Sequence, residues 1–471
     1  MILAIDQGTT GTTCLVVDDE FHVRGRGYRE LPQRFPRPGW VEHDPEEIWA
    51  GVVGAAEAAV ADAGISPLEL QAIGITNQRE TTLLWERGSG KAVAPAIVWQ
   101  DRRTAERCRE LPADLIRSRT GLVPDPYFSA TKLEWLLART DVPREELAFG
   151  TVDSWLVWKL TRGRVHVTDL TNASRTMLLD LDSLNWNDEL LTLFGIDREL
   201  LPQLVRSSEV VGEGELLGVT LPIAGIAGDQ QASLFGHGCF ERGDAKATYG
   251  TGSFVLVNVG EMRGTVPAGL LETVSASGGY ALEGAVLVSG AAIQWLRDGL
   301  GILGSAAESE VLARSVESNG GIYFVPALTG LGSPHWDADA RGLVTGITRG
   351  TTRAHLVRAA LEAIAFQVAD VLDVLPGNLG VLRADGGGTD NAFLMQFQAD
   401  VLGCRIDVAA ERETTALGAA ALAGLATGVW PSRDAVRERL HPAATYEPSA
   451  DAADRTRLRD EWRRALRRAL L

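Results

Sequence analysis

The chain has 471 residues, too many for one hydrophobic core, so two or more domains are expected. Hydrophobic residues make up 45% and charged residues 23% of the chain, which indicates a soluble globular protein and excludes a disordered or fibrous one. The formal net charge of −17 disfavours binding to nucleic acid or to anionic membranes, so an anionic ligand needs locally placed Arg and Lys.

The cysteines and the apolar stretches bear on the cellular compartment. The cysteines lie far apart and form no CxxC pair, so we expect neither a zinc site nor a disulfide framework, and a reducing cytoplasm fits best: Cys14, Cys108, Cys239 and Cys404. Met1 leads directly into an apolar run, which predicts that no secretory signal peptide is present. The longest apolar stretch, Ala416 to Trp430, is shorter than the roughly 20 residues that span a bilayer and predicts a tightly packed core helix.

The first stretch of the chain, residues 1–18, has the pattern of a β-hairpin with an unusual turn. Two apolar runs flank a polar turn in which Gly8 and Gly11 free the backbone, while four threonines add hydroxyls and N–H groups. Such a loop can hold an anion, and Asp6 at the tip of the first strand is placed for a Mg²⁺ ion that accompanies phosphates. An ordinary Asp/Gly hairpin turn remains the alternative on these residues alone.

The next segments combine helix and strand signals with polar residues at strand ends. Asp44 as N-cap and Pro45 at the first helical position predict a helix that runs to Gly64. Arg79 and Glu80 follow a buried strand; such a pair is usually solvated, but together the two side chains supply the donors and acceptors that a polyol needs. Trp99 ends another apolar strand and is either a core residue or a platform for a substrate.

A second group of candidates lies before residue 243. The run Val165–Met177 is polar for its length, and the sequence suggests no specific chemistry for it. The buried strand at residues 223–227 delivers Asp229 to the head of a helix. An Asp there is most often a helix N-cap, and the competing role is that of a general base which takes the proton of an alcohol.

Glycine loops recur in the second half of the chain. Residues 247–257 again have the pattern strand, Gly/Thr turn, strand, and Gly386 to Gly388 form a third loop between a strand and a helix. Two phosphate hairpins suggest a duplicated nucleotide-binding unit, and this plan resembles that of actin, heat-shock chaperones and sugar kinases. We therefore expect an α/β fold of two actin-like (ribonuclease H-like) ATPase domains, residues 1–243 and 244–471, with an interdomain cleft.

The ordered motifs resemble those of the FGGY carbohydrate kinases, and most closely the branch that phosphorylates glycerol. The resemblance covers the chain from Met1 to about Trp462. Its segments are DQGTT at Asp6, PGWVEHDPEEIW at Pro38, GITNQRETT at Gly74, IVWQ at Ile97, DPYFS at Asp125, GTVDSWLVWKLT at Gly150, GIAGDQQASLFG at Gly225, YGTGSF at Tyr249 and NAFLMQFQADVLG at Asn391.

The resemblance implies an activity and assigns roles to matching positions. It implies transfer of the ATP γ-phosphoryl group to glycerol, giving sn-glycerol 3-phosphate and ADP, with Asp229 as general base and Asp6 acting through Mg²⁺. The glycerol contacts that it implies are Arg79, Glu80, Trp99, Tyr127, Asp229, Gln230 and Phe254. The ATP contacts that it implies are Thr9, Thr10, Gly11, Thr251, Gly290, Gln294, Gly387 and Asn391. A cytoplasmic homo-oligomer that starts glycerol breakdown is expected.

One position departs from the family pattern, and two other functions stay open. The family commonly has an Arg near the transferring phosphate where this chain has Thr13, so the work of that cation is lost, or shifts to Arg79 or a second ion. A kinase for a larger polyol or ketose is one alternative, and it needs more room beside Trp99 and Phe254. A nucleotide-dependent switch of the actin type is the other, and it gives Arg79, Glu80 and Asp229 no purpose.

Overall fold

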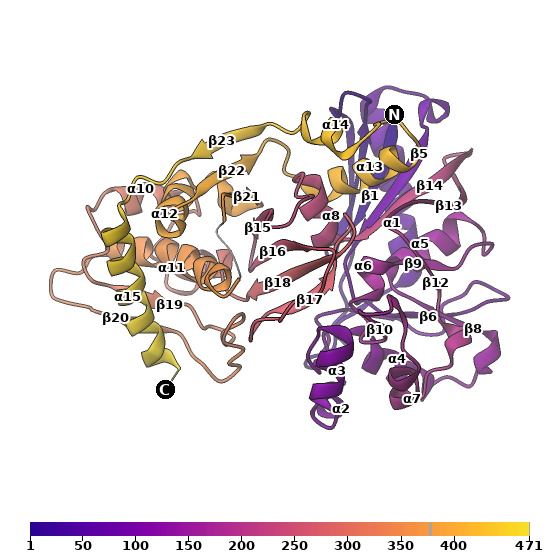
Figure 1. Cartoon of the computed structure of the whole chain (residues 1–471), viewed down its shortest axis with the longest axis horizontal. Coiled ribbons are helices and arrows are strands. Elements are labelled where there is room, and N and C mark those ends of the chain that lie inside the picture. Colours follow the sequence, from indigo (N-terminus) through magenta and orange to yellow (C-terminus); the bar gives the residue numbers. More distant parts are fainter. Residues whose placement is uncertain (376–378, 471) are drawn as a thin grey trace.

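The computed structural model describes residues 1–375 and 379–470. Residues 376–378 and 471, which fall in the predicted second domain, lie outside the described part. Figure 1 shows two lobes, one from the indigo to magenta part of the chain and one from the orange to yellow part. Each lobe is built on a mixed β-sheet, and the strands β16 to β18 lie where the lobes meet.

The first sheet has six strands in the order β13-β14-β5-β1-β2-β3. Its bounds are β1 Ile2–Gln7, β2 Gly11–Val17, β3 Val23–Glu30, β5 Ala72–Asn77, β13 Ser208–Leu216 and β14 Val219–Gly228. β1 is antiparallel to β2 and parallel to β5. Residues 2–5 are buried on both faces of the sheet because helices cover both faces.

The second sheet has seven strands in the order β17-β18-β16-β15-β21-β22-β23. Its bounds are β15 Ala245–Tyr249, β16 Ser253–Gly260, β17 Leu271–Val274, β18 Tyr280–Val286, β21 Val381–Asp385, β22 Arg405–Ala409 and β23 Pro442–Tyr446. β15 is antiparallel to β16 and parallel to β21, as β1 is to β2 and β5. This repetition confirms the expected α/β fold of two actin-like units.

Helices pack against these sheets, and the sequence signals predicted the bounds of α1 (Pro45–Ala63). α1 begins at Asp44, whose carboxylate accepts a hydrogen bond from the N–H of Glu46, and ends at Gly64 in the left-handed conformation. α11 (Arg353–Asp373) and α12 (Ala392–Leu402) belong to the core of the second lobe. The capping chemistry of α1 is local, so it could be predicted from the sequence.

α13 (Thr414–Ala426) comes from the second half of the chain but packs on the first sheet. It lies against β1, β5, β14 and the helix α8 (Asp229–Gly236), and Figure 1 shows it in yellow beside the indigo strands. The crossing with α8 is so close that a Cβ on Gly418 would lie 1.9 Å from the carbonyl oxygen of Ala232. The expected core helix is confirmed. The domain division between residues 243 and 244 stays a prediction, because α13 follows this boundary in the sequence but packs on the sheet of the first lobe.

The remaining elements complete the two lobes. The other helices are α2 Ala105–Arg109, α3 Ala113–Thr120, α4 Ser129–Leu137, α5 Val152–Leu160, α6 Leu170–Ala173, α7 Asp188–Phe194, α9 Gly290–Gln294, α10 Glu308–Arg314, α14 Arg433–Arg437 and α15 Ala452–Ala469. The short strands are β4 Glu42–His43, β6 Leu83–Glu86, β7 Ala96–Ile97, β8 Leu147–Gly150, β9 Val167–Asp169, β10 Leu179–Asp180, β11 Asn185–Trp186, β12 Gln203–Val205, β19 Tyr323–Val325 and β20 Leu343–Thr345. Within residues 1–375 and 379–470, no helix combines the length and the apolar character that crossing a bilayer requires.

Candidate active site

Arg79 and Glu80 lie in the turn that follows β5 at the carboxyl edge of the first sheet. Only 2% of Arg79 and 1% of Glu80 is exposed, so this is not the solvated pair that such neighbours usually form. Glu80 has a φ of 63°, a left-handed conformation that is rare for a residue with a side chain and often marks a functional site. The carbonyl oxygen of Glu80 accepts hydrogen bonds from Ser129 Oγ at 3.0 Å and Lys132 Nζ at 3.4 Å, which hold this turn.

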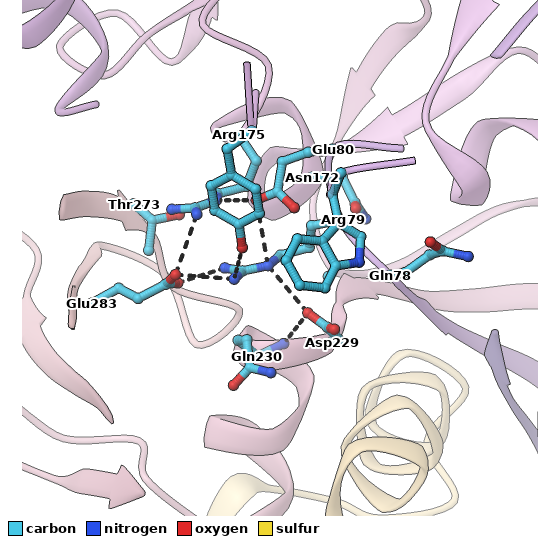
Figure 2. Close-up of polar contacts among 12 residues, drawn as sticks. Gln78, Arg79, Glu80, Asn172, Arg175, Asp229, Gln230, Thr273 and Glu283 are labelled. Atoms are coloured by element: carbon cyan, nitrogen blue, oxygen red, sulfur yellow. Dashed lines mark hydrogen bonds and ion pairs between the residues drawn. The ribbon is translucent and has the colours of Figure 1, made fainter. Parts of the chain in front are cut away.

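Two arginines and three carboxylates meet around this turn (Figure 2). Arg79 donates from Nη1 and Nη2 to the two carboxylate oxygens of Glu283, at 2.6 and 3.0 Å, while its Nε lies 3.1 Å from Asp229 Oδ1. Arg175 donates from Nε to Glu80 Oε1 at 2.6 Å and from Nη2 to Glu283 Oε1 at 3.2 Å. Buried charges are tolerated when they are paired in this way.

Glu283 and Asp229, two of the carboxylates of this cluster, are in different electrostatic states. Burial tends to raise the pKa of Glu283, but Arg175 and Arg79 outweigh it and lower the pKa to about 2. Burial raises the pKa of Asp229 above its usual range, and the opposing effect of Arg79 is smaller. The Asp229 side chain is also 32% exposed, whereas Glu283 is almost fully covered. Asp229 is therefore the carboxylate placed to exchange a proton with a bound molecule.

An aromatic wall lies beside the cluster and connects it to the first phosphate hairpin. The rings of Trp99 and Tyr127 pack edge to face with centroids 5.4 Å apart. Trp99 donates from Nε1 to Thr9 Oγ1 at 2.9 Å, so this Trp is not an ordinary core residue. The hydroxyl of Tyr127 lies 3.5 Å from Arg79 Nη2. The wall offers an apolar surface to carbon atoms while Arg79 and Asp229 offer polar groups.

The second lobe contributes the other side of the site. Gln230, which follows Asp229 at the start of α8, accepts a hydrogen bond from Lys246 Nζ at 2.5 Å. Lys246 also donates to Thr248 Oγ1 at 2.8 Å, and Thr248 pairs with Phe254 across the β15–β16 hairpin. Phe254 is partly exposed and packs on the small apolar cluster of α8 and β16. Asp229 is the first residue of α8 and Gly228 its N-cap, so the N-cap alternative for Asp229 is wrong.

A cavity of about 590 Å³ in the second lobe brings together five of the predicted nucleotide contacts. They are Thr251, Gly290, Gln294, Gly387 and Asn391. Ile293, Leu361, Ile364 and Leu394 form apolar parts of its lining. A cavity of this size with an apolar lining and glycine-rich loops suits the base and ribose of a nucleotide. The other three predicted contacts, Thr9, Thr10 and Gly11, do not line it and lie on the β1–β2 hairpin of the first lobe.

Each of the two hairpins has a turn closed by a backbone hydrogen bond between two glycines, which are three residues apart in the first turn and two residues apart in the second. The N–H of Gly8 donates to the carbonyl of Gly11 at 2.8 Å, and the N–H of Gly250 donates to the carbonyl of Gly252 at 2.9 Å. Gly290 must approach the second hairpin closely, since a Cβ there would lie 2.6 Å from the carbonyl oxygen of Gly250. Both turns contain glycines that leave the backbone free to form an anion-binding loop.

Asp6 has the surroundings of a cation ligand. It is the second-last residue of β1, and burial together with the charges of Asp229 and Glu413 raises its pKa well above its usual range. Within the described residues, no Lys or Arg forms an ion pair with it at 4.0 Å or less. A hard divalent cation prefers carboxylate oxygens, and its charge would relieve this repulsion, so the donor set fits such an ion.

The structure limits which side chain can supply the positive charge that the family commonly has at the position of Thr13. Arg79 is enclosed by carboxylates and is not free to turn toward the first hairpin. Thr13 pairs with Tyr28 of β3, and Arg26, two residues before Tyr28, projects from the same face of the sheet. Arg26 binds Glu413 at 3.1 Å, and Glu413 is one of the charges that act on Asp6.

Sequence reasoning missed three charged residues of the site. Arg175 lies in the polar run 165–177, to which no chemistry had been assigned. Glu283 and Lys246 are lone charged residues in otherwise apolar strands, and both are buried. A lone charge in a buried strand is itself a signal of a specific partner, but its partners here come from distant segments of the chain.

Two actin-like halves with a polar, aromatic-walled site and a nucleotide-sized cavity define a class of protein: a small-molecule kinase that works between its two lobes. Comparison with family models identifies the family. Residues 1–236 match the N-terminal domain, and residues 245–427 the C-terminal domain, of the FGGY family of carbohydrate kinases. The chain belongs to the FGGY family of carbohydrate kinases.

Relatives within this family point to one branch. The chain is 51% identical to "Glycerol kinase 2" of Thermotoga maritima over 100% of this chain and 98% of that protein. It is also 51% identical to a glycerol kinase of Deinococcus radiodurans, over 99% of this chain and 97% of that protein. The solved structure of Plasmodium falciparum glycerol kinase with ADP has a TM-score of 0.93 at 35% identity, covering 100% of this chain and 98% of that chain.

Proposed function

We propose that this protein transfers the γ-phosphoryl group of ATP to glycerol and releases sn-glycerol 3-phosphate and ADP. The observation that carries the proposal is the partly exposed Asp229, held by Arg79 beside the aromatic wall of Trp99 and Tyr127. Relatives with about half of their residues in common over the whole chain are named glycerol kinases, which supports the same substrate here.

In this mechanism, Arg79, Glu80 and Gln230 bind the glycerol hydroxyls while Trp99 and Phe254 contact its carbon chain. Asp229 takes the proton of the terminal hydroxyl as the oxygen of that group forms a bond to the γ-phosphorus. The bond between the γ-phosphorus and the bridging oxygen breaks, and ADP leaves with that electron pair. Positioning and electrostatic stabilisation dominate such a transfer, so approach of the two lobes around both substrates is expected.

The nucleotide is placed by residues of both lobes. Gly290, Gln294, Gly387 and Asn391 are assigned to the nucleoside end, because they line the cavity of the second lobe. The hairpins at Thr9–Gly11 and Thr251 are assigned to the phosphates. Asp6 would hold a Mg²⁺ ion, which supplies positive charge to the phosphates when it is bound.

An enzyme assay with a panel of acceptors tests the proposed substrate. ADP formation is measured with glycerol, dihydroxyacetone, erythritol, xylulose and gluconate, each with ATP and Mg²⁺ and with Mn²⁺ in parallel. Glycerol is expected to give the highest kcat/KM, and glycerol-3-phosphate dehydrogenase is expected to oxidise the product. A higher kcat/KM with xylulose would favour the ketose alternative, and ATP hydrolysis that no acceptor stimulates would favour the switch.

Location and assembly are further parts of the proposal. All four cysteines are free and buried, which supports a reducing compartment such as the cytoplasm. A homo-oligomer is proposed by the family resemblance alone, and sedimentation of the purified protein would test it.

A further inference from the structure

We propose that Glu283 of the second lobe is a positioning residue for the phosphoryl transfer: it fixes the Arg79 guanidinium so that Arg79 can orient Asp229. This inference rests on the proposed function. It adds a residue from the opposite lobe to a site whose other polyol contacts come mainly from the first half of the chain.

The geometry of Glu283 leaves Arg79 little freedom. Glu283 lies in the middle of β18 and is 1% exposed. Its two oxygens accept from Nη1 and Nη2 of Arg79 in a two-point contact, which sets both the position and the plane of a guanidinium. The Arg79 Nε then lies 3.1 Å from Asp229 Oδ1, with which it forms an ion pair. Figure 2 shows this sequence of contacts from Glu283 through Arg79 to Asp229.

Arg175 fixes Glu283 from another direction. Its Nη2 lies 3.2 Å from Glu283 Oε1, and its Nε binds Glu80 at 2.6 Å. Arg175 itself is completely buried and does not contact Asp229 directly. The arrangement is a closed set of ion pairs: Arg175 contacts Glu80 and Glu283, and Arg79 contacts the same two carboxylates and Asp229 as well. Moving Glu283 therefore changes the orientation of Arg79, while Arg175 and Glu80 remain paired.

The charges explain why Glu283 affects the chemistry and not only the fold. Asp229 is surrounded by Arg79 and Lys246 as cations and by Glu283 and Asp6 as anions. If Glu283 becomes a neutral amide, Arg79 loses its two-point partner and interacts more strongly with Asp229. The pKa of Asp229 then falls, because the positive charge beside it is no longer shared with Glu283. A carboxylate held in this way is a weaker base and is displaced from its position.

The chain offers a matched control on the neighbouring strand. Glu272 of β17 is also 1% exposed, and β17 pairs with β18 so that Glu272 lies opposite Leu282. Glu272 pairs with Arg263 at 2.9 Å and contacts neither Arg79 nor Arg175. Replacing it by Gln thus removes an equally buried glutamate of the same sheet without touching the proposed contacts.

The experiment compares Glu283→Gln with Glu272→Gln in the intact protein, using kcat, KM for glycerol, KM for ATP and the pH profile of kcat/KM. For Glu283→Gln we expect kcat to fall about tenfold to a hundredfold and KM for glycerol to rise, since misplaced groups cost this much. KM for ATP should stay within about twofold, and the acid limb of the profile should move to lower pH. Glu283→Asp should recover part of the lost kcat.

Several outcomes would overturn the inference. Wild-type kinetics for Glu283→Gln would do so, and so would an equal loss in Glu272→Gln, which would indicate a general effect of buried charge. If Glu283→Gln fails to fold, Arg175→Lys decides instead: it should raise KM for glycerol but not for ATP, and unchanged kinetics would reject the proposal. A wild-type enzyme inactive on glycerol would reject the proposed function itself, which the same assay measures separately.

Discussion

Replacing Asp229 by Asn tests the role of the general base with a nearly isosteric change. Asn can still accept the hydrogen bond that Asp229 now accepts from the N–H of Gln230 at 2.7 Å, and its amide oxygen can take the place of Oδ1, which lies 3.1 Å from Arg79 Nε. The site should therefore keep its shape while it loses its proton acceptor. General bases contribute about 10²–10⁴ in rate, so kcat should fall at least about a hundredfold, or about 2.7 kcal/mol of activation free energy.

The assay separates chemistry from binding and folding. Single-turnover formation of the phosphorylated product measures the chemical step, and titration with a non-hydrolysable ATP analogue measures nucleotide affinity, which should not change. The matched control is Asp188→Asn, because Asp188 is a highly exposed residue of α7 paired only at the surface with Arg198. This control should retain wild-type turnover.

The substitution Asp229→Asn is expected to change folding stability in the opposite direction from turnover, which gives an independent test. The pKa of Asp229 is higher in the folded protein than in the unfolded chain because burial disfavours the charged form. The contribution of Asp229 to folding stability therefore decreases as the pH rises above the pKa that this group has in the unfolded chain, because the carboxylate then ionises. At neutral pH, Asp229→Asn should unfold at an equal or higher temperature than the wild type while turnover is lost. Near-normal turnover of Asp229→Asn would remove this residue from the chemistry.

Three further changes test other parts of the structure. Asp6→Asn should raise the Mg²⁺ concentration needed for half-maximal rate and, because the pKa of Asp6 is raised by burial, should increase the melting temperature at neutral pH without metal. Arg26→Gln should lower kcat about tenfold or more, since it removes a cation that binds Glu413 near the first hairpin. Trp462→Ala should cost about 3–5 kcal/mol of unfolding free energy, because Trp462 is fully buried and stacks on Phe366 with centroids 5.2 Å apart.

A specific result would contradict each of these three predictions. An unchanged Mg²⁺ requirement would separate Asp6 from the metal. Equal rates for Arg26→Gln and Arg24→Gln would show that Arg26 has no special place, since Arg24 lies on the same strand and pairs with Asp18. Wild-type denaturant unfolding of Trp462→Ala would mean that α15 adds little to the stability of the second core.

The hairpins, the caps of α1 and the triple-glycine loop could be predicted because their causes lie within a few residues. Gly8 and Gly11 make the first turn, and Asp44 and Gly64 bound α1, whatever the rest of the chain does. The order of these loops also indicated a duplicated nucleotide-binding fold.

Long-range contacts determine the parts that the sequence left open. Arg79 and Glu80 could equally have been a solvated surface pair, and only folding encloses them with Arg175 and Glu283, which come from distant segments. α13 likewise returns across the chain to pack on the first sheet, where close approach to α8 requires glycine.

The sequence by itself thus determined the local turns, the helix boundaries and, through its motifs, the family and most of the candidate contacts. The tertiary structure decided which charges are buried together, and hence that Asp229 is a partly exposed carboxylate whose pKa is raised by burial, while Glu283 is a strong acid fixed between two arginines. The physical reason is that burial and charge pairing depend on which distant residues meet, and no local pattern of residues specifies that.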